Sequence, residues 1–164
     1  MGEVLVMLIA IILNLQGLPA GAATVGCCAN MIGFAVASFK ENKLGGLLAQ
    51  GLGTSMLQMA NILKRPLIWV PSILTSAILG PVSTCILKMT NTPTGAGMGT
   101  SGLVGQFGAY SAMSESFGNL QTILLILAMH VIAPAVLSLI IHLALKKLGI
   151  VKDEYLKLEN PDKN

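Results

Sequence analysis

Charged residues occur at only a few points along the chain, and they divide it into five long uncharged runs. These runs cover residues 4–39, 44–63, 66–87, 89–114 and 116–145. A helix needs about 20 apolar residues to cross a bilayer. On this pattern we predict membrane-spanning helices over residues 21–39, 66–87 and 119–145.

The first run is too long for one helix, and a Gly-Leu-Pro-Ala-Gly sequence interrupts it at residues 17–21. We expect a short helix over residues 4–15, about 18 Å long and therefore too short to cross a core of about 30 Å. A secretory signal is the alternative, but Glu3 stands where such signals carry positive charge. We interpret the segment as the stub of a longer helix, in a chain that begins partway through a larger protein.

The runs 44–63 and 89–114 differ from the others, because they are rich in glycine and uncharged polar residues. Residues 91–108 alone hold six of the chain's eighteen glycines, and each costs about 1 kcal/mol relative to alanine inside a helix. Irregular backbone at membrane depth occurs only where it is buried in protein or lines a watery cavity. A Gly-x-Gly-Thr-Ser sequence at residues 51–55 recurs at residues 97–101. Glycine-interrupted apolar segments in matching positions indicate a transporter binding site.

Positively charged residues decide the predicted orientation, because they gather on the cytoplasmic side of membrane proteins. If residues 44–63 formed an ordinary span, the cations that flank them would lie on opposite sides. If the run instead enters and leaves by one face, all four of these cations become cytoplasmic: Lys40, Lys43, Lys64 and Arg65. The run 89–114 then dips in from the opposite face, and the last span returns to the cytoplasm.

The predicted fold class is therefore an all-α integral membrane protein. It has about three full transmembrane helices, two re-entrant helical hairpins that point at one midplane from opposite faces, and the N-terminal stub helix. Prolines are expected to break the second span at Gly80–Pro81 and to kink the third at Pro134. Residues 1–148 form the membrane domain, and residues 149–164 form a short, solvated polar tail in the cytoplasm.

Composition supports the membrane class and excludes others. Apolar residues make up 54% of the chain and charged residues 10%, whereas soluble domains carry about 25% charged residues. The net charge of +3 and the 4% of aromatic residues provide neither the basic patch nor the stacking surface of a nucleic-acid binder. Cys27, Cys28 and Cys85 lie in apolar runs, so we interpret them as small buried hydrophobic residues. Without ligands at metal spacing or a Walker A sequence, no metal or other cofactor is predicted.

Uncharged polar side chains gather near the two predicted hairpin turns. Such groups can hydrogen-bond a small polar solute, and successive glycine N–H groups can form a nest of donors. The alternative is that the glycines only permit close packing, while the hydroxyls bond to the backbone. The candidate solute-binding residues are Gln50, Thr54, Ser55, Gln58, Asn61, Thr94, Gly97, Gly99, Thr100, Ser101 and Gln106.

Two ionisable residues are candidates for a functional role, because ionisable groups inside a membrane are rare and commonly functional. Glu115 is the only acidic residue between positions 41 and 153, although it can equally mark the outer end of its hairpin. His130 lies within the last span, where a hydrogen bond to a neighbouring helix is the alternative role. His142 is expected at the cytoplasmic interface. Lys64 and Arg65 are either a topology signal or a docking point for a partner subunit.

Five sequence blocks carry a family resemblance. They are AGAATVGCCA at residues 20–29, ENKLGG at 41–46, GLGTSMLQ at 51–58, AILGP at 77–81 and GAGMGTSGLVGQ at 95–106. Together they resemble the EIIC-like membrane proteins of the phosphotransferase system (PTS), and within these the branch that includes a clostridial toxin-regulatory protein. The resemblance covers about residues 15 to 145 and corresponds to the C-terminal half of the family.

The resemblance implies a permease of the bacterial inner membrane that takes up a sugar and presents it for phosphorylation. On this reading the polar groups near the hairpin turns would bind the sugar, and Glu115 and His130 become the candidates for accepting a proton during phosphoryl transfer. Because no EIIA or EIIB domain is fused to the chain, the phosphoryl donor is expected on separate EIIA/EIIB-like subunits, and any enzymatic role is at most that of the membrane subunit. The other expected partners are the lipid bilayer and either further copies of the chain or a missing N-terminal half. The alternatives are a membrane-embedded sensor that keeps the fold without transport, and a truncated half without activity.

Overall fold

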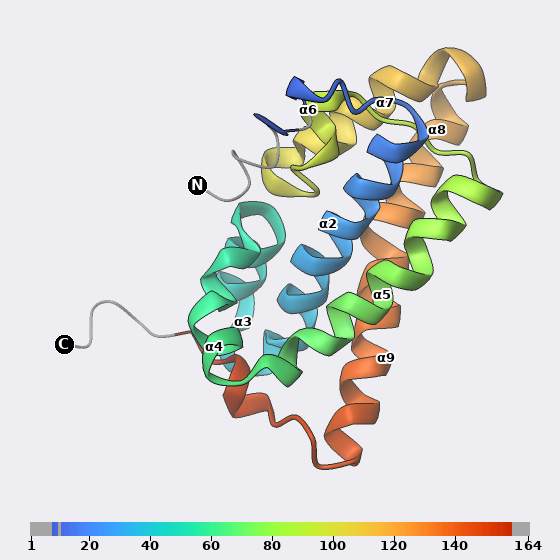
Figure 1. Ribbon diagram of the computed structural model, residues 1–164. Coiled ribbons are helices and arrows are strands. Elements are labelled where there is room, and N and C mark those ends of the chain that lie inside the picture. Colours follow the sequence, from blue (N-terminus) through green and yellow to red (C-terminus); the bar gives the residue numbers. More distant parts are fainter. Residues whose placement is uncertain (1–7, 10, 159–164) are drawn as a thin grey trace.

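Three long helices organise the part of the chain that the computed structural model describes, residues 8, 9 and 11–158 (Figure 1). The first is α2 (Leu18–Ala37), and the others are continuous stacks of shorter helical segments. Each of the three is long and apolar enough to cross a membrane, and their positions confirm the three predicted spans. The second consists of η3 (Pro66–Trp69), α5 (Val70–Pro81) and η4 (Val82–Ile86), and the third of α8 (Asn119–Leu127), η6 (Ala128–Ile132) and α9 (Ala133–Lys147).

Helix α2 is central, with α5 and α9 packed along it (Figure 1). Buried residues make up 56% of its apolar window, against 33% and 28% for the other two long helices, so the outer helices keep broad apolar faces for lipid. A β-carbon at Gly33 would lie 2.6 Å from Ser138 Oγ and 3.0 Å from Ser72 Oγ. Glycine at this position therefore lets all three helices approach closely.

The two prolines change the helical hydrogen-bond register without stopping the helices. The chain stays helical across Pro81 and continues as the π-helical segment η4, so the break expected at Gly80–Pro81 is wrong. Ser83 and Thr84 donate their hydroxyl protons to Gly80 O, at 2.8 and 3.2 Å. The π-helical segment η6 likewise precedes Pro134, and such bulges accommodate residues that cannot continue a regular ladder.

Two helical hairpins account for the glycine-rich runs (Figure 1). Hairpin 1, residues 39–64, starts near the end of the bundle where α9 stops, turns, and returns there. Hairpin 2, residues 93–117, lies at the other end, beside the starts of α2 and α8. Hairpin 1 consists of α3 (Phe39–Leu48), η1 (Ala49–Gly53), η2 (Ser55–Gln58) and α4 (Met59–Lys64), and hairpin 2 of α6 (Pro93–Ala96), η5 (Ser101–Leu103) and α7 (Val104–Phe117).

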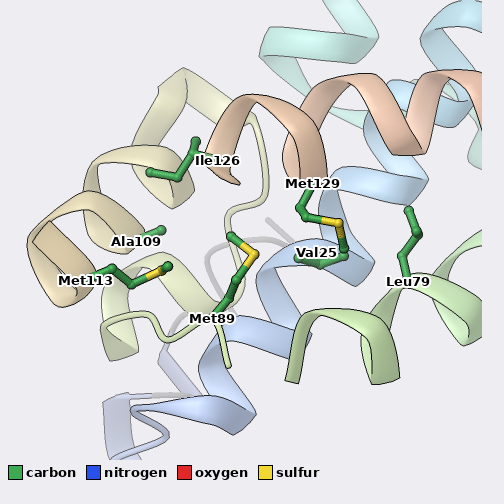
Figure 2. Packing of buried hydrophobic residues seen from close by; sticks show 7 residues of the cluster. All are labelled: Val25, Leu79, Met89, Ala109, Met113, Ile126 and Met129. Atoms are coloured by element: carbon green, nitrogen blue, oxygen red, sulfur yellow. The ribbon is translucent and has the colours of Figure 1, made fainter. Parts of the chain in front are cut away.

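A cluster of buried hydrophobic side chains joins hairpin 2 to the long helices (Figure 2). Val25 of α2 and Leu79 of α5 meet Met129 of η6 on one side of this cluster, and Met113 of α7 lies on the other. Flexible methionine side chains fill irregular gaps between helices that cross at different angles. The complete cluster is Val25, Leu79, Met89, Ala109, Met113, Ile126 and Met129.

The C-terminal segment and two smaller features differ from expectation. Val151 and Leu156 are 0% and 1% exposed, so a wholly solvated tail is wrong for residues 150–158; this segment includes the short helix η7 (Asp153–Leu156). Cys85 is exposed, unlike buried Cys28, because it faces outward from the second long helix. Of the expected stub helix over residues 4–15, residues 4–7 and 10 lie outside the described residues.

Candidate functional site

The turns of the two hairpins meet through hydrogen bonds between hydroxyl and carbonyl groups. Thr100 Oγ1 donates to Gly51 O, and Ser101 Oγ donates to Gly53 O at 2.9 Å. Thr100 is 1% exposed, so the first of these bonds is buried. Two segments almost fifty residues apart in sequence are therefore joined at a polar contact.

Local helix geometry makes the carbonyls of hairpin 1 available. The last carbonyls of a helix have no partner within that helix, and η1 ends at Gly53 because Thr54 is extended, with φ −152° and ψ 136°. The hydroxyl of Thr54 accepts a hydrogen bond from Met56 N at 3.1 Å and caps η2. The carbonyls of Gly51 and Gly53 are thus left for donors from hairpin 2.

The turn of hairpin 2 lies directly against the backbone of α2. Gly99 has φ +53°, and a β-carbon there would lie 2.8 Å from Cys27 Cβ and 2.9 Å from the Cys27 carbonyl carbon. A β-carbon at Gly105 would meet Gly99 O and would lie 2.9 Å from Thr24 Cγ2. Gly97, which ends α6, is also buried. Close packing therefore explains the glycines at 99 and 105.

Three of the candidate residues form a polar network at the base of hairpin 1. Gln50 Nε2 donates to Ser38 Oγ at 2.8 Å, and Gln58 Nε2 donates to Gln50 Oε1 at 2.9 Å. Asn61 Nδ2 in turn donates to Gln58 Oε1 at 2.8 Å. Gln50 and Gln58 are both fully buried. Because their amides already bond within the protein, these side chains connect hairpin 1 to its surroundings.

Ser55 belongs to a different group, on the α2 side of hairpin 1. Asn30 Nδ2 donates to Ser55 Oγ at 2.9 Å, while Trp69 Nε1 donates to Asn30 Oδ1 at 3.0 Å. Asn30 was not among the residues selected from sequence. Its signal was nevertheless present, since it is the only side-chain amide within the span Leu18–Ala37.

Gln106 and His130 come together beside α2. Gln106 Nε2 lies 3.3 Å from His130 Nδ1 and donates to Cys28 Sγ at 3.6 Å. His130 is 1% exposed. Gln106 Oε1 is also buried, and it has no hydrogen-bond partner among the residues that the structure describes. A buried, unpaired amide oxygen is costly, and its lone pairs remain open to a hydrogen-bond donor.

The remaining candidates lie apart from the meeting point of the turns. Thr94 is exposed, and its hydroxyl pairs with that of Thr92 at 3.0 Å. Glu115 is exposed near the end of α7, about 16 Å along the helix from its first residue. His142 is buried beside Asp153, with 3.5 Å between Nε2 and Oδ1.

Comparison with known proteins identifies the family. A family model for phosphotransferase system EIIC proteins matches residues 6–158. No curated protein and no solved structure gives a significant match. The matched residues form most of the chain, and three of its helices suit a membrane. The chain therefore belongs to the phosphotransferase system EIIC family of membrane proteins.

Proposed function

We propose that this chain is the permease part of a phosphoenolpyruvate-dependent sugar phosphotransferase system in the bacterial inner membrane. It moves a sugar across the bilayer and presents it to EIIA/EIIB-like subunits that supply the phosphoryl group. Family membership supports the class of function. The observation that carries the mechanism is the contact between the two hairpin turns.

The position of this contact supports re-entrant hairpins. The turn of hairpin 2 packs on Cys27, close to the middle of α2, and Gly51 of hairpin 1 packs on the side chains of Ile32 and Ala35. If α2 spans the bilayer, the turns meet near its midplane. Irregular backbone at that depth requires protein or a polar cavity around it, and the opposite hairpin and α2 provide the protein.

The distribution of positively charged residues supports the orientation predicted from the sequence, in which hairpin 1 enters the membrane from the cytoplasm. Lys40 and Lys146 both bond to Asp153, and Arg65 lies over the ring of Tyr155. These cations therefore gather at the end of the bundle from which hairpin 1 enters. Cytoplasmic loops are enriched in such residues, so we place this end in the cytoplasm and hairpin 2 on the outer side.

In this proposal the sugar replaces the contacts between the turns. Its oxygen atoms can accept hydrogen bonds from the hydroxyls of Thr100 and Ser101, and one of its hydroxyl groups can donate to the unpaired oxygen of Gln106. The imidazole of His130 then accepts the proton that the attacking sugar hydroxyl releases during phosphoryl transfer. Backbone and uncharged side chains hold a sugar without binding it too tightly for release, which suits a transport site.

Reconstituted vesicles test the proposal. With the phosphoryl-donor subunits and phosphoenolpyruvate present, they should accumulate phosphorylated sugar. The variant Gln106→Leu should lower this uptake by roughly tenfold or more, because it removes a buried hydrogen-bond group. Ser111→Ala, an exposed change on the same helix, is the matched control and should transport normally.

Two results would contradict the proposal at different points. Sugar binding without accumulation by the wild-type protein would indicate a sensor. Normal uptake by Gln106→Leu would instead leave the permease intact and remove Gln106 from the site.

A further inference from the structure

The chain reverses direction after α9 and returns beneath hairpin 1 (Figure 1). Gly149 has φ +75°, a conformation in which helices commonly end. Its N–H donates to Lys146 O at 3.0 Å, and Ile150 N–H donates to Leu145 O at 3.0 Å. These bonds close the helix and direct residues 150–158, here named the C-terminal strap, toward the base of hairpin 1.

The strap completes a small hydrophobic core. Val151 and Leu156 are almost completely buried, and they pack with Phe34 of α2, Ile62 of α4 and Ile68 of η3. Phe34, Ile62 and Ile68 belong to three different elements that the strap brings into one cluster. Without the strap, this cluster would be open to water.

Hairpin 1 also binds the backbone of the strap. The amide of Asn42 donates to Leu156 O at 2.8 Å and accepts from Leu158 N at 2.9 Å. Gln58 Nε2 donates to Leu156 O at 2.9 Å, and Asn61 Nδ2 donates to Lys157 O at 3.0 Å. Three amide side chains of one hairpin thus satisfy backbone groups that would otherwise require water.

A single carboxylate links the strap to both of its neighbours. Asp153 accepts hydrogen bonds from Lys146 at the end of α9 and from Lys40 at the start of hairpin 1, the latter at 2.9 Å. Chiefly because of Lys146, the pKa of Asp153 falls to about 2, so the carboxylate remains charged in the cytoplasmic pH range. The guanidinium of Arg65 lies 3.5 Å from the ring centroid of Tyr155 and adds a cation–π contact.

From the strap, a continuous series of hydrogen bonds reaches the turn of hairpin 1. Leu156 O accepts from Gln58, Gln58 donates to Gln50, and Gln50 directly precedes Gly51 in the chain. The carbonyl of Gly51 is the group that receives Thr100 of hairpin 2. We infer that the C-terminal strap positions hairpin 1, and that releasing the strap loosens the contact between the two turns. This inference concerns the geometry of the hairpins and does not depend on transport.

Hydrogen–deuterium exchange of the full chain in lipid nanodiscs tests the inference. Leu156→Ala should accelerate exchange in the strap and in residues 49–58 by roughly tenfold or more, because it leaves a cavity in the small core. Residues 104–117 of hairpin 2 should exchange at the wild-type rate. Lys157→Ala is the matched control, since Lys157 contributes its backbone oxygen and its side chain is exposed.

The variant Asp153→Asn provides a second measurement without a cavity. It should accelerate exchange in the same two regions, by a smaller factor. If either variant loosens the strap and leaves residues 49–58 unchanged, the strap does not position hairpin 1. If Leu156→Ala also accelerates exchange in residues 104–117, its cavity loosens the whole protein, and the test then rests on Asp153→Asn. Unchanged exchange of residues 49–58 in Asp153→Asn would overturn the inference.

Discussion

Hairpins 1 and 2 carry the same Gly-x-Gly-Thr-Ser sequence, yet their turns have different conformations. In hairpin 1, Gly51 and Gly53 lie in a π-helical turn and present their carbonyl groups. In hairpin 2, Gly99 adopts φ +53°, and the hydroxyls that follow it point toward the other hairpin. The first turn supplies acceptors and the second supplies donors, so the two are complementary and not equivalent.

The two hairpins also rest on different supports. Hairpin 2 packs its glycines on α2 and shares a methionine-rich core with the long helices. Hairpin 1 is held at its base by buried amides and by the C-terminal strap. Apolar packing is hard to reverse, whereas a polar network with one apolar anchor can open at lower cost. We therefore expect hairpin 1 to open more readily than hairpin 2.

The largest difference is expected from adding one methyl group to each turn. Gly99→Ala should lower the free energy of unfolding by about 3 kcal/mol, because alanine resists the left-handed conformation and its methyl would meet Cys27. In Gly53→Ala the nearest atom to the new methyl is Leu48 O at 4.0 Å, so the change should stay within about 1 kcal/mol. Chemical unfolding in detergent measures both.

Equal effects of these two substitutions would mean that the turns are equivalent after all. The same geometry affects how larger substitutions are interpreted. Gly99→Leu would abolish uptake if Gly99 touched solute, but it would also disrupt packing on α2. Loss of uptake in that variant therefore does not by itself indicate a solute contact.

A smaller difference is expected when each threonine loses its hydroxyl. Thr100→Val removes the donor to Gly51 O in a buried position and should cost about 2 kcal/mol of unfolding free energy. Thr54→Val removes a partly exposed helix cap and should cost about 1 kcal/mol or less. Amide exchange at residues 51–53 should rise in the first variant. A larger loss of stability in Thr54→Val than in Thr100→Val would mean that the cap of η2 contributes more than the contact between the turns.

The sequence was sufficient for the main architecture. Span positions follow from charge spacing and helix length, two properties that are local to the chain, and the glycine content singled out both hairpin segments. The roles of individual candidate residues are harder to predict from the sequence. Gln50 and Gln58 were selected for their polarity, but their partners Ser38 and Leu156 depend on how distant segments pack. Polarity alone does not indicate whether a side chain faces solute or backbone.

The C-terminal strap and the candidate site both depend on contacts between segments that are distant in sequence, and such contacts cannot be predicted from local patterns. Val151 and Leu156 flank the charged residues 152–154, and their burial depends on Phe34 and Ile62, which are far away in sequence. Asn30 stands out in the sequence as the only side-chain amide of residues 18–37, and Cys28 is interpreted as a small hydrophobic residue, but neither observation reveals a partner. Their proximity to Ser55 and Gln106 emerges only from the tertiary structure.

The smallest expected effect is a pH dependence confined to the hairpin 1 side. Lys146 and Lys40 lower the pKa of Asp153 from its usual 3.8 to about 2, and His142 and Glu154 also lie nearby. Stabilisation by this carboxylate is therefore fully present above about pH 4, and it is lost as the pH falls toward 2. Pepsin cleavage of the strap should be slower in the wild type than in Asp153→Asn at pH 4.

At pH 2 the two cleavage rates should lie much closer together, because a carboxyl group with a pKa of about 2 is then about half protonated, and its protonated form resembles the amide. Comparing the two proteins at each pH cancels the pH dependence of pepsin itself. Cleavage within hairpin 2 should show the same ratio at both pH values, since no residue of α6, η5 or α7 contacts Asp153 among the contacts described. A ratio for the strap that does not change with pH would mean that Lys40 and Lys146 contribute nothing measurable. Hairpin 1 would then be held by amides and apolar packing alone, and its support would differ less from that of hairpin 2.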